Sequence, residues 1–534
     1  MKQRLLLLFA LLPSLAFAQT VNWSFAVKDA SFGQAAAADL DGDGKAEIVF
    51  SCYWNDSNVY VLNAQTGALK WKQNLGGCND AAPLIADIDG DGKSEVIVAS
   101  SCKPITTCFN GANGAIKWQT ATGGSDSPPT IADIDGDGQL EIIHGQFNGH
   151  VICLNAKTGT VKWDLVVDEG ASIQTEIGIL DADKDGKLDF ILATWSYEDS
   201  NRIYCYRGSN RTLMWVSKLP KDLIYHGAAF GDIDRDGKME ITVGDYAANL
   251  FCLNAENGSP LWIDSFPTPY NYIGAPTTLA DLNRDKYLDV IYCDNYHVGA
   301  VKHDGSPLWT YNLPNYGTAF RGVAVADVNN DNILDVTFGS SKGTVTSLNG
   351  MTGAVIRTMD LRTVYGDTFE VDHAPLIADF TGDGIKDVFI VGGKARYPNI
   401  GVNYGKAYCL SWGAGKGPDW TMFRHDVRRS ACLCDAAGLP IAPLSVANGS
   451  LANSSLRLYP SPASQVLRVE ADLEPGEVLV RILDATGKLV LAERVVTQPD
   501  FRWEGDISRL AAGSYIVELQ CNGIRPSLPF TIVR

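Results

Sequence analysis

Residues 39–47 read Asp39-Leu-Asp41-Gly-Asp43-Gly44-Lys-Ala-Glu47, and the apolar run Ile48-Val-Phe50 follows at once. Four carboxylates within nine residues repel one another unless a cation lies among them. Acids at loop positions one, three, five and nine, with Gly at position six, are typical of a turn that wraps Ca²⁺ in oxygen ligands. Glycine adopts the positive φ that the sharp bend requires. The segment therefore predicts a calcium-binding loop that leads into a strand.

The pattern of residues 39–47 returns seven times along the chain, at spacings of 46 to 52 residues. A period of this length is that of one four-stranded propeller blade. In each period a strand of small apolar residues precedes the acidic loop and a β-branched strand follows it. A third strand then leads through a turn into a strand that ends, in most periods, in Trp. The sequence predicts an all-β fold, an eight-bladed β-propeller, with seven blades and an irregular unit as the alternative.

Five of the eight loops contain every oxygen donor that the calcium turn needs, and the last three depart from it. Lys286 stands where the sixth loop needs Gly, Asn332 stands there in the seventh, and Thr381 replaces an acid in the eighth. We expect calcium occupancy to fall from the first five loops to the last three. The predicted metal ligands, loop by loop, are Asp39, Asp41, Asp43 and Glu47; Asp87, Asp89, Asp91 and Glu95; Asp133, Asp135, Asp137 and Glu141; Asp181, Asp183, Asp185 and Asp189; Asp232, Asp234, Asp236 and Glu240; Asp281, Asn283, Asp285 and Asp289; Asp327, Asn329, Asp331 and Asp335; and Asp379, Asp383 and Asp387.

Calcium suits these loops better than Mg²⁺, because a cage made only of protein oxygens fits the larger ion. Strands flank the loops, whereas an EF-hand or a dockerin requires flanking helices. The alternative interpretation is that the turns are merely acidic and solvated. We expect a structural role, in which each ion fixes the connection between the two inner strands of a blade.

The loops on the other face of the predicted propeller are rich in aromatic residues. Loops after the first and third strands of a blade share one face with the acidic turns, and loops after the second and fourth strands share the opposite face. Rings among Asn, Asp and His suit sugars, whose apolar faces stack while their hydroxyls form hydrogen bonds. The alternative is that these rings cover blade edges. The predicted ligand-binding aromatic residues are Tyr53, Trp54, Trp195, Tyr197, Tyr246, Tyr270, Tyr272 and Tyr296.

The residue six positions before each acidic loop is expected to start an innermost strand beside the central channel. Three of these eight positions hold His226, Arg321 and His373. Such groups could converge on a carboxylate or another polar ligand. The alternative is a wet lining of the channel.

Two stretches of the repeat resemble known propeller families. The segment from Asp39 to Val49 is similar to the FG-GAP or VCBS repeat of integrin-type propellers, and the segment from Leu62 to Trp71 resembles the repeat of quinoprotein-type propellers. The resemblance implies a propeller over residues 19–435. The isolated strand at residues 21–25 would complete the last blade and leave few exposed edges. Residues 418–426 resemble a segment that closes such propellers.

The two ends of the chain are typical of export. Residues 1–18 are expected to be a signal peptide, with Lys2 and Arg4 before an apolar stretch and a small-residue cleavage site. Residues 436–455 read as a linker. Residues 456–534 resemble the C-terminal sorting domain of type IX secretion substrates, a small β-sandwich. This resemblance implies the type IX secretion machinery as a partner, and release or attachment at the outer cell surface. No later stretch is long enough for a membrane-spanning helix, and we expect a monomer.

The composition argues against a nucleic-acid partner and does not determine how the cysteines pair. The formal net charge is −18, and acids of the loops account for the excess, which argues against nucleic-acid binding. Five of the twelve cysteines occupy one equivalent strand position and are expected to be buried core residues: Cys108, Cys153, Cys205, Cys252 and Cys409. The other seven lie near turns or ends, where pairing is possible: Cys52, Cys78, Cys102, Cys293, Cys432, Cys434 and Cys521.

Two functions are compatible with this sequence. The first is a secreted or surface-attached calcium-binding propeller that binds a glycan or protein partner through the face opposite its acidic loops. The second is a calcium-dependent polysaccharide lyase of the rhamnogalacturonan-lyase type, because some eight-bladed propellers with similar acidic loops have this activity. A lyase needs a base and a group that stabilises the developing charge, but no local motif marks either. A quinone-dependent dehydrogenase has less support, because only the blade repeat resembles that family.

Overall fold

The computed structural model describes two parts of the chain. The first comprises residues 20–432 except 199–200, 267, 364–368, 397, 416–417, 421, 423–424 and 427–428. The second comprises residues 457–459, 465–471, 477–484, 489–496, 501–510, 513–520 and 527–532. The predicted signal peptide (1–18) and linker (436–455) lie outside the described residues.

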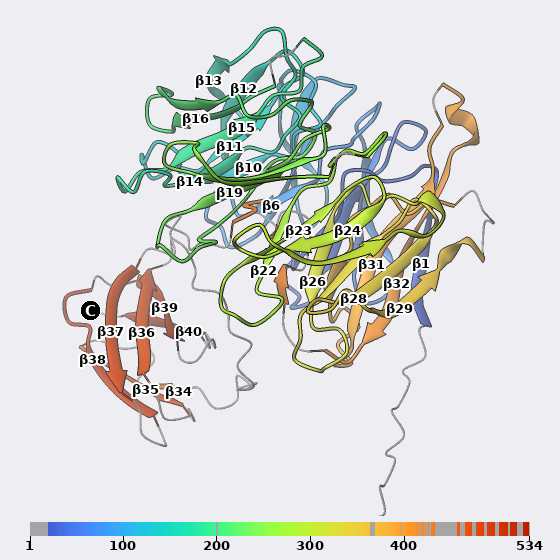
Figure 1. The fold of residues 1–534 in the computed structure, drawn as a ribbon. Helices are drawn as coiled ribbons and strands as arrows, with labels where there is room; N and C mark the ends of the chain where they lie inside the picture. Colours follow the sequence, from blue (N-terminus) through green and yellow to red (C-terminus); the bar gives the residue numbers. More distant parts are fainter. Residues whose placement is uncertain are drawn as a thin grey trace, which may run out of the picture.

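The first part is an eight-bladed β-propeller, in which antiparallel sheets succeed one another around a ring (Figure 1). The first strands of neighbouring blades lie side by side and are therefore innermost. The blades consist of β2 (Ala36–Ala38), β3 (Glu47–Ser51), β4 (Asn58–Asn63) and β5 (Leu69–Asn74); β6 (Leu84–Ala86), β7 (Glu95–Ala99), β8 (Ile105–Asn110) and β9 (Ile116–Ala121); β10 (Thr130–Ala132), β11 (Glu141–Gly145), β12 (His150–Asn155) and β13 (Val161–Val166); β14 (Gly178–Leu180), β15 (Asp189–Ala193), β16 (Ile203–Arg207) and β17 (Leu213–Ser217); β18 (Ala229–Gly231), β19 (Glu240–Gly244), β20 (Asn249–Asn254) and β21 (Pro260–Ser265); β22 (Thr278–Ala280), β23 (Asp289–Cys293), β24 (His297–Val301) and β25 (Pro307–Asn312); β26 (Val323–Ala326), β27 (Asp335–Gly339), β28 (Thr344–Asn349) and β29 (Val355–Asp360); and β30 (Leu376–Ala378), β31 (Lys386–Lys394), β32 (Tyr404–Gly413) and β1 (Thr20–Val27).

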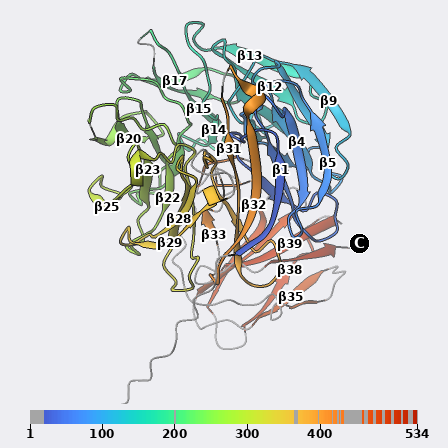
Figure 2. The ribbon, with the colours of Figure 1, turned by 90° about the vertical axis from the view of Figure 1, so that its right-hand side faces the viewer.

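The last blade takes its outer strand from the start of the chain. Strand β1 pairs antiparallel with β32, with Trp23 opposite Cys409 and Phe25 opposite Ala407 (Figure 2). The prediction that residues 21–25 complete the final blade is confirmed, and so is the count of eight blades. The ring is closed by hydrogen bonds between strands from its two ends.

Burial along each blade explains its strand pattern. In blades one to seven every residue of the second strand is buried, as in β3 and β7, because neighbouring blades cover both of its faces. The fourth strand, such as β5, alternates exposed and partly buried residues at the rim. The continuous apolar runs after the acidic loops are therefore core strands, and the alternating runs that contain Trp are outer strands.

Tryptophans of the outer strands join six of the eight blades to the next one. Trp71 Nε1 donates a hydrogen bond to the Gly111 carbonyl of blade two, over 2.6 Å. Its ring packs over Gly114, where φ is +70° and a Cβ would lie 2.7 Å from the ring. The same bond is made by Trp23, Trp118, Trp215, Trp262 and Trp309 to the carbonyls of Ala64, Ala156, Ala255, His303 and Gly350. Trp23 lies on β1, so this contact also joins the eighth blade to the first.

Residues after the eighth blade fill the centre of the ring. Strand β33 (Pro418–Trp420) adds to the seventh blade beside β26. The buried Arg429 donates hydrogen bonds to the carbonyls of Pro83 and Ala35, in blades two and one. Phe230 N–H of blade five donates to the Ala431 carbonyl over 2.9 Å. This segment therefore contacts the inner strands of blades one, two, five and seven.

The C-terminal part contains two antiparallel sheets. One has the order β34 (Arg457–Tyr459), β35 (Val466–Ala471), β38 (Phe501–Asp506), and the other β37 (Leu489–Val496), β36 (Glu477–Asp484), β39 (Gly513–Gln520), β40 (Ser527–Ile532). Leu467, Val480, Trp503 and Val517 belong to one buried cluster drawn from both sheets. This agrees with the predicted C-terminal β region.

Helices are limited to single 3-10 turns among the described residues: Pro314–Tyr316, Leu361–Thr363 and Ile400–Val402. Within these described ranges, no helix has the length and hydropathy needed to cross a membrane.

The described cysteines are either buried free thiols or members of disulfides. The five at the equivalent strand position are buried and free, as predicted. Cys78 and Cys102 form a disulfide, and Cys432 is also disulfide-bonded. Cys52 and Cys293 are buried free thiols, whereas Cys434 and Cys521 lie outside the described residues.

Replacing Gly114 by Ala tests the contact between blades. The new methyl group would meet the Trp71 ring at 2.7 Å, and φ is +70°. We expect the free energy of unfolding, measured in urea, to fall by about 2–4 kcal/mol. The matched control is Gly76→Ala, where φ is +72° but the nearest atom is 3.9 Å away. Equal losses in the two variants would show that the tryptophan contact contributes nothing.

Candidate functional site

The eight acidic loops share one hydrogen-bonded turn. In blade one, Asp39 accepts the amides of Gly42 and Gly44, over 2.8 and 2.9 Å. Glu47 at position nine accepts the amide of Leu40 over 3.0 Å through Oε2. In every loop the position-six amide donates to the position-one carboxylate. These bonds hold the acids in place before any ion binds.

The turn also forms in the sixth loop, although Lys286 stands at position six. Its φ is +76°, and its amide still donates to Asp281 over 3.0 Å. Hydrogen bonding within the loop therefore maintains the turn in spite of the backbone strain that a side chain brings at this φ.

Five loops bring at least three carboxylate oxygens within 4.8 Å of one another. They are the five that keep every donor in the sequence. The grouped residues are Asp39, Asp41 and Asp43; Asp87, Asp89 and Glu95; Asp133, Asp135 and Glu141; Asp181, Asp183 and Asp189; and Asp232, Asp234 and Glu240. Oxygen-only donor sets of this kind fit Ca²⁺.

Electrostatics in the fourth and fifth loops also fit a divalent cation. Burial raises the pKa of Asp189 to about 7 and that of Glu240 to about 8, and neighbouring acids add to both shifts. Asp232 Oδ1 and Glu240 Oε1 are buried and have no hydrogen-bond partner among the described residues. A bound cation would supply the positive charge that these carboxylates need in order to remain ionised.

In the eighth loop, hydrogen bonds from other residues of the chain satisfy the acid at position nine. Asp387 accepts Asn22 Nδ2 over 2.8 Å and the amides of Phe380 and Thr381 over 2.9 and 3.0 Å. Asn22 comes from β1, the strand that closes the ring. The position-nine acid of this loop therefore has hydrogen bonds at both oxygens, whereas Glu240 Oε1 in the fifth loop has no hydrogen-bond partner among the described residues.

On the opposite face, rings from blades four to seven form one cluster. Trp195, after β15, lies 5.1 Å from Tyr225 and 5.3 Å from Tyr246 between ring centroids. Tyr246 lies 4.8 Å from Tyr272, and Phe320 lies 5.1 Å from Tyr225. All five residues are half-buried. Tyr197, 83% exposed, packs edge-on against Trp195.

A cavity of about 370 Å³ adjoins this cluster. Trp195 and Tyr197 line it together with Phe147, Ser172 and Gln174.

Four of the predicted aromatic residues lie outside this cluster: Tyr53 and Trp54 in blade one, and Tyr270 and Tyr296 in the loops around blade six. Tyr270 is 88% exposed, and no ring contact involving it is found in the described structure. The Tyr296 hydroxyl donates to the Pro269 carbonyl over 3.0 Å. Tyr270 lies in the turn that enters blade six and Tyr296 between its second and third strands, and their part in ligand binding stays a prediction.

Arg321 connects this cluster to a smaller group in blade one. Its guanidinium carbon lies 5.1 Å from the ring centroid of Phe32, 5.5 Å from that of Tyr225 and 5.3 Å from that of Phe320. Phe32 packs on Tyr53 at 5.2 Å, and Tyr53 packs on Trp54 at 6.4 Å. Aromatic side chains of blade one and of the cluster from blades four to seven thus meet at the Arg321 guanidinium.

The sequence predicted that the three channel residues start innermost strands. The structure places them just before these strands instead. His226, Arg321 and His373 lie two or three residues before β18, β26 and β30, in the turns that enter these strands. All three are at least nine-tenths buried. His226 Nδ1 lies 3.3 Å from Glu176 Oε1. Burial, with Arg321 and Arg429 nearby, lowers the pKa of His373 to about 3.

Sequence reasoning missed three aspartates at the axis. Asp80, Asp126 and Asp372 stand one position before the channel residues, where Phe32, Tyr225 and Phe320 stand in other blades. Burial raises the pKa of each aspartate, and the charge of Arg321 opposes this shift. Each has an Oδ1 that is buried and unpartnered within the described residues. Their position holds different residue types in the other blades, so no repeat pattern marks them in the sequence.

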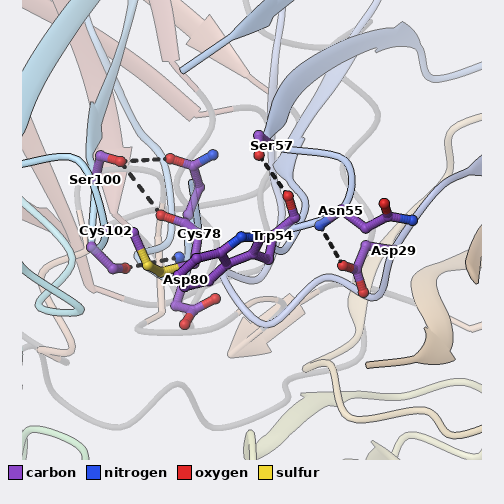
Figure 3. The surroundings of a disulfide bond; sticks show 10 residues. Asp29, Trp54, Asn55, Ser57, Cys78, Asp80, Ser100 and Cys102 are labelled. Atoms are coloured by element: carbon purple, nitrogen blue, oxygen red, sulfur yellow. Dashed lines mark hydrogen bonds between the residues drawn. A yellow bond between two sulfur atoms is a disulfide. The ribbon is translucent and has the colours of Figure 1, made fainter. Parts of the chain in front are cut away.

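The disulfide anchors the loop that carries Asp80. Cys78 and Cys102 join the two loops of blade two on this face, and Trp54 lies beside them (Figure 3). Asp80 N–H donates to Ser101 Oγ over 3.2 Å, and Ser100 Oγ donates to Asn79 Oδ1 over 2.9 Å. The position of Asp80 is therefore fixed from both sides.

Family comparisons agree with this architecture. The model described as FG-GAP-like repeat matches residues 39–98, 87–144, 181–243 and 281–338, and that of a secretion system C-terminal sorting domain matches residues 457–526. The chain carries FG-GAP-like repeats and a type IX sorting domain. The sorting domain indicates that this FG-GAP propeller is secreted or held at the cell surface. No curated protein matches the chain by sequence.

Solved structures share the fold at low identity. Quinohemoprotein alcohol dehydrogenase from Comamonas testosteroni is 14% identical, with a TM-score of 0.52 over 75% of this chain and 77% of that chain. A europium-containing methanol dehydrogenase is 11% identical, with a TM-score of 0.54 over 74% and 93%. Sqt1 from Saccharomyces cerevisiae is 11% identical, with a TM-score of 0.52 over 72% and 97%. These similarities show the propeller fold alone.

The buried His373 generates a pH prediction. The unfolded chain binds a proton at this residue near pH 6.5, whereas the folded protein does not until about pH 3. Stability is therefore lost as the pH falls through this window. Between pH 7 and pH 5, we expect the free energy of unfolding, measured in urea, to fall by about 2 kcal/mol less in His373→Gln than in the wild type. Identical losses in the two proteins would contradict the burial of a neutral imidazole.

Proposed function

We propose that this secreted propeller binds calcium in its FG-GAP loops and a glycan on the opposite face. The observation that carries the proposal is the continuity of that face. Half-buried rings from blades one and four to seven meet at Arg321, and three aspartates surround the same axis.

The rings supply the apolar part of such a site. The axial C–H faces of a sugar stack on aromatic rings, and a ring held by its neighbours loses little conformational entropy on binding. Trp195 is held in this way by Tyr225 and Tyr246 and borders the cavity of about 370 Å³. This favours Trp195 as the main stacking platform.

The axis supplies the polar part. A carboxylate accepts hydrogen bonds from two hydroxyls, and a guanidinium donates up to five. Asp80, Asp126 and Asp372 therefore offer acceptors, and Arg321 offers donors from a position fixed by three rings. A ligand rich in hydroxyl groups satisfies both kinds, which favours a glycan over an apolar protein surface.

The calcium loops would support this face from the other side of the molecule. Each loop connects the two inner strands of a blade, and the turns that carry Arg321 and the aspartates lead directly into the first of these strands. An ion that fixes the loop also fixes the strand and hence the entering turn. The proposed role of calcium is therefore structural.

The two histidines give little support to the lyase alternative. His373 is 2% exposed with a pKa of about 3, and His226 is 8% exposed beside Glu176. A base that removes a proton from a polymer has to reach it. Binding without turnover is the better-supported function.

A glycan array probed with the signal-free protein, with and without Ca²⁺, tests the proposal. An assay for unsaturated uronate on pectic substrates should accompany it. We expect glycan binding without unsaturated product. Unsaturated product would establish the lyase, and a protein that binds no glycan under either condition would refute the proposed ligand.

Trp195→Ala and Arg321→Ala should each weaken binding of the array's best glycan by roughly tenfold or more, measured by calorimetry. The reason is loss of the stacking ring in one variant and of the axial donor in the other. Tyr270→Ala is the matched control, because Tyr270 is an exposed ring on the same face outside the cluster. If Arg321→Ala melts at the wild-type temperature and binds the glycan with unchanged affinity, Arg321 is not part of the binding site.

Calcium removal should lower the melting temperature. One site at a calcium concentration one hundred times its Kd adds about 2.7 kcal/mol, so excess EDTA should lower the melting temperature of the propeller by roughly 5 °C or more. Adding Ca²⁺ back in excess should restore it. A melt that does not change in EDTA would count against calcium binding.

A further inference from the structure

We infer that lysines of the chain act as built-in counter-ions in the first three FG-GAP loops, and that blade five holds the strongest calcium site. This inference rests on the calcium binding proposed above and divides the five complete loops, which the sequence had ranked together. It follows from which cations lie within reach of each loop.

In blades one to three, an ammonium group lies among the loop carboxylates. Lys70 Nζ pairs with Asp41 and lies 3.0 Å from Glu47 Oε1. Lys117 Nζ lies 2.6 Å from Asp89 and 2.9 Å from Glu95. Lys162 Nζ lies 2.8 Å from Asp135 Oδ2, 2.9 Å from Asp137 Oδ2 and 2.8 Å from Glu141 Oε1. In each loop it therefore contacts the position-nine acid and at least one acid earlier in the loop.

The three lysines occupy one position in the blade. Each immediately precedes the Trp of its outer strand, in β5, β9 and β13. The side chain spans the sheet from the fourth strand to the loop between the first two, so Nζ lies where those carboxylates converge. Calcium binding there requires these charge-assisted hydrogen bonds to break and the lysine to move out.

Blade four is an intermediate case. Arg207, the last residue of β16, pairs with Asp183 over 2.7 Å and with Asp185 over 2.9 Å. It forms no pair within 4.0 Å with Asp181 or Asp189 in the described structure. Two acids of this loop are thus balanced and two are not.

Blade five lacks such a cation. Leu261 stands at the lysine position, before Trp262. The nearby basic groups have other partners: Lys238 pairs with Glu256 over 2.9 Å, Arg235 lies over Tyr287 at 5.9 Å, and Lys184 donates to the Gly237 carbonyl. No basic side chain of the described chain lies within 4.0 Å of the four carboxylates of this loop.

Two oxygens of blade five point to a missing positive partner. Glu240 is 0% exposed, and its Oε1 has no hydrogen-bond partner in the described structure, while Oε2 accepts Ile233 N–H over 2.8 Å. Asp232 Oδ1 is likewise buried and unpartnered there. The carboxylates of this loop are already held by backbone amides, so a calcium ion displaces nothing.

Calorimetric titration of the metal-free, signal-free protein with Ca²⁺, with native mass spectrometry to count ions, tests the inference. The wild type should fill one tight site first. The triple variant Lys70→Met, Lys117→Met, Lys162→Met should bind three further ions at least about tenfold more tightly than the wild type does, because nothing competes for those loops.

The reciprocal substitution is Leu261→Lys, which places a lysine in the same position of blade five. It should weaken the tight site by about tenfold or more. Leu308→Lys is the matched control: it precedes Trp309 in blade six, whose loop lacks a grouped set of carboxylates in the described structure, and it should leave the tight site unchanged.

The outcomes separate this inference from the proposed calcium binding. Equal affinities in all five loops, unaffected by either set of substitutions, would overturn the lysine inference and leave calcium binding standing. No calcium uptake by the wild type or any variant would overturn both. Tight uptake only after the lysines are replaced would support the lysines as counter-ions and reject blade five as the strongest site.

Discussion

Repulsion between carboxylates is the constraint on which the rest of this structure depends. Each complete loop places four acids on one tight turn between the two inner strands of a blade, and backbone amides fix the acid at position one and the acid at position nine. Charge at this density is stabilised by a nearby cation. Lysines from outer strands supply it in blades one to three, and blade five groups carboxylate oxygens for which the proposed counter-ion is Ca²⁺.

Closure of the ring depends on a second contact, from indole N–H to carbonyl. Trp71 and its equivalents bind the turn of the following blade, and Trp23 on β1 makes the same bond to blade one. The chain then continues into the centre, where Arg429 bonds to blades one and two.

Much of the fold is readable from the sequence, because spacing of 46 to 52 residues and strict loop chemistry leave few alternatives. The axial aspartates could not be predicted from the sequence, because their position holds Phe32, Asp80 and Tyr225 in different blades and shows no pattern. Lys70 was missed for another reason: in the sequence it is an ordinary polar residue of an outer strand. Its approach to Glu47, 23 positions earlier, depends on the twist of the sheet and on side-chain length, which only coordinates show.

The inner strands join the two faces: the acidic loops lie at one end of these strands, and the turns that carry Arg321 and the aspartates lie at the other. The most direct test is anomalous X-ray diffraction from crystals of the propeller grown with Ca²⁺ or a lanthanide substitute. The account predicts the strongest peak among Asp232, Asp234, Asp236 and Glu240, with Lys70, Lys117 and Lys162 still seated in their own loops at low ion concentration. Crystals with no anomalous peak in any acidic loop would contradict it.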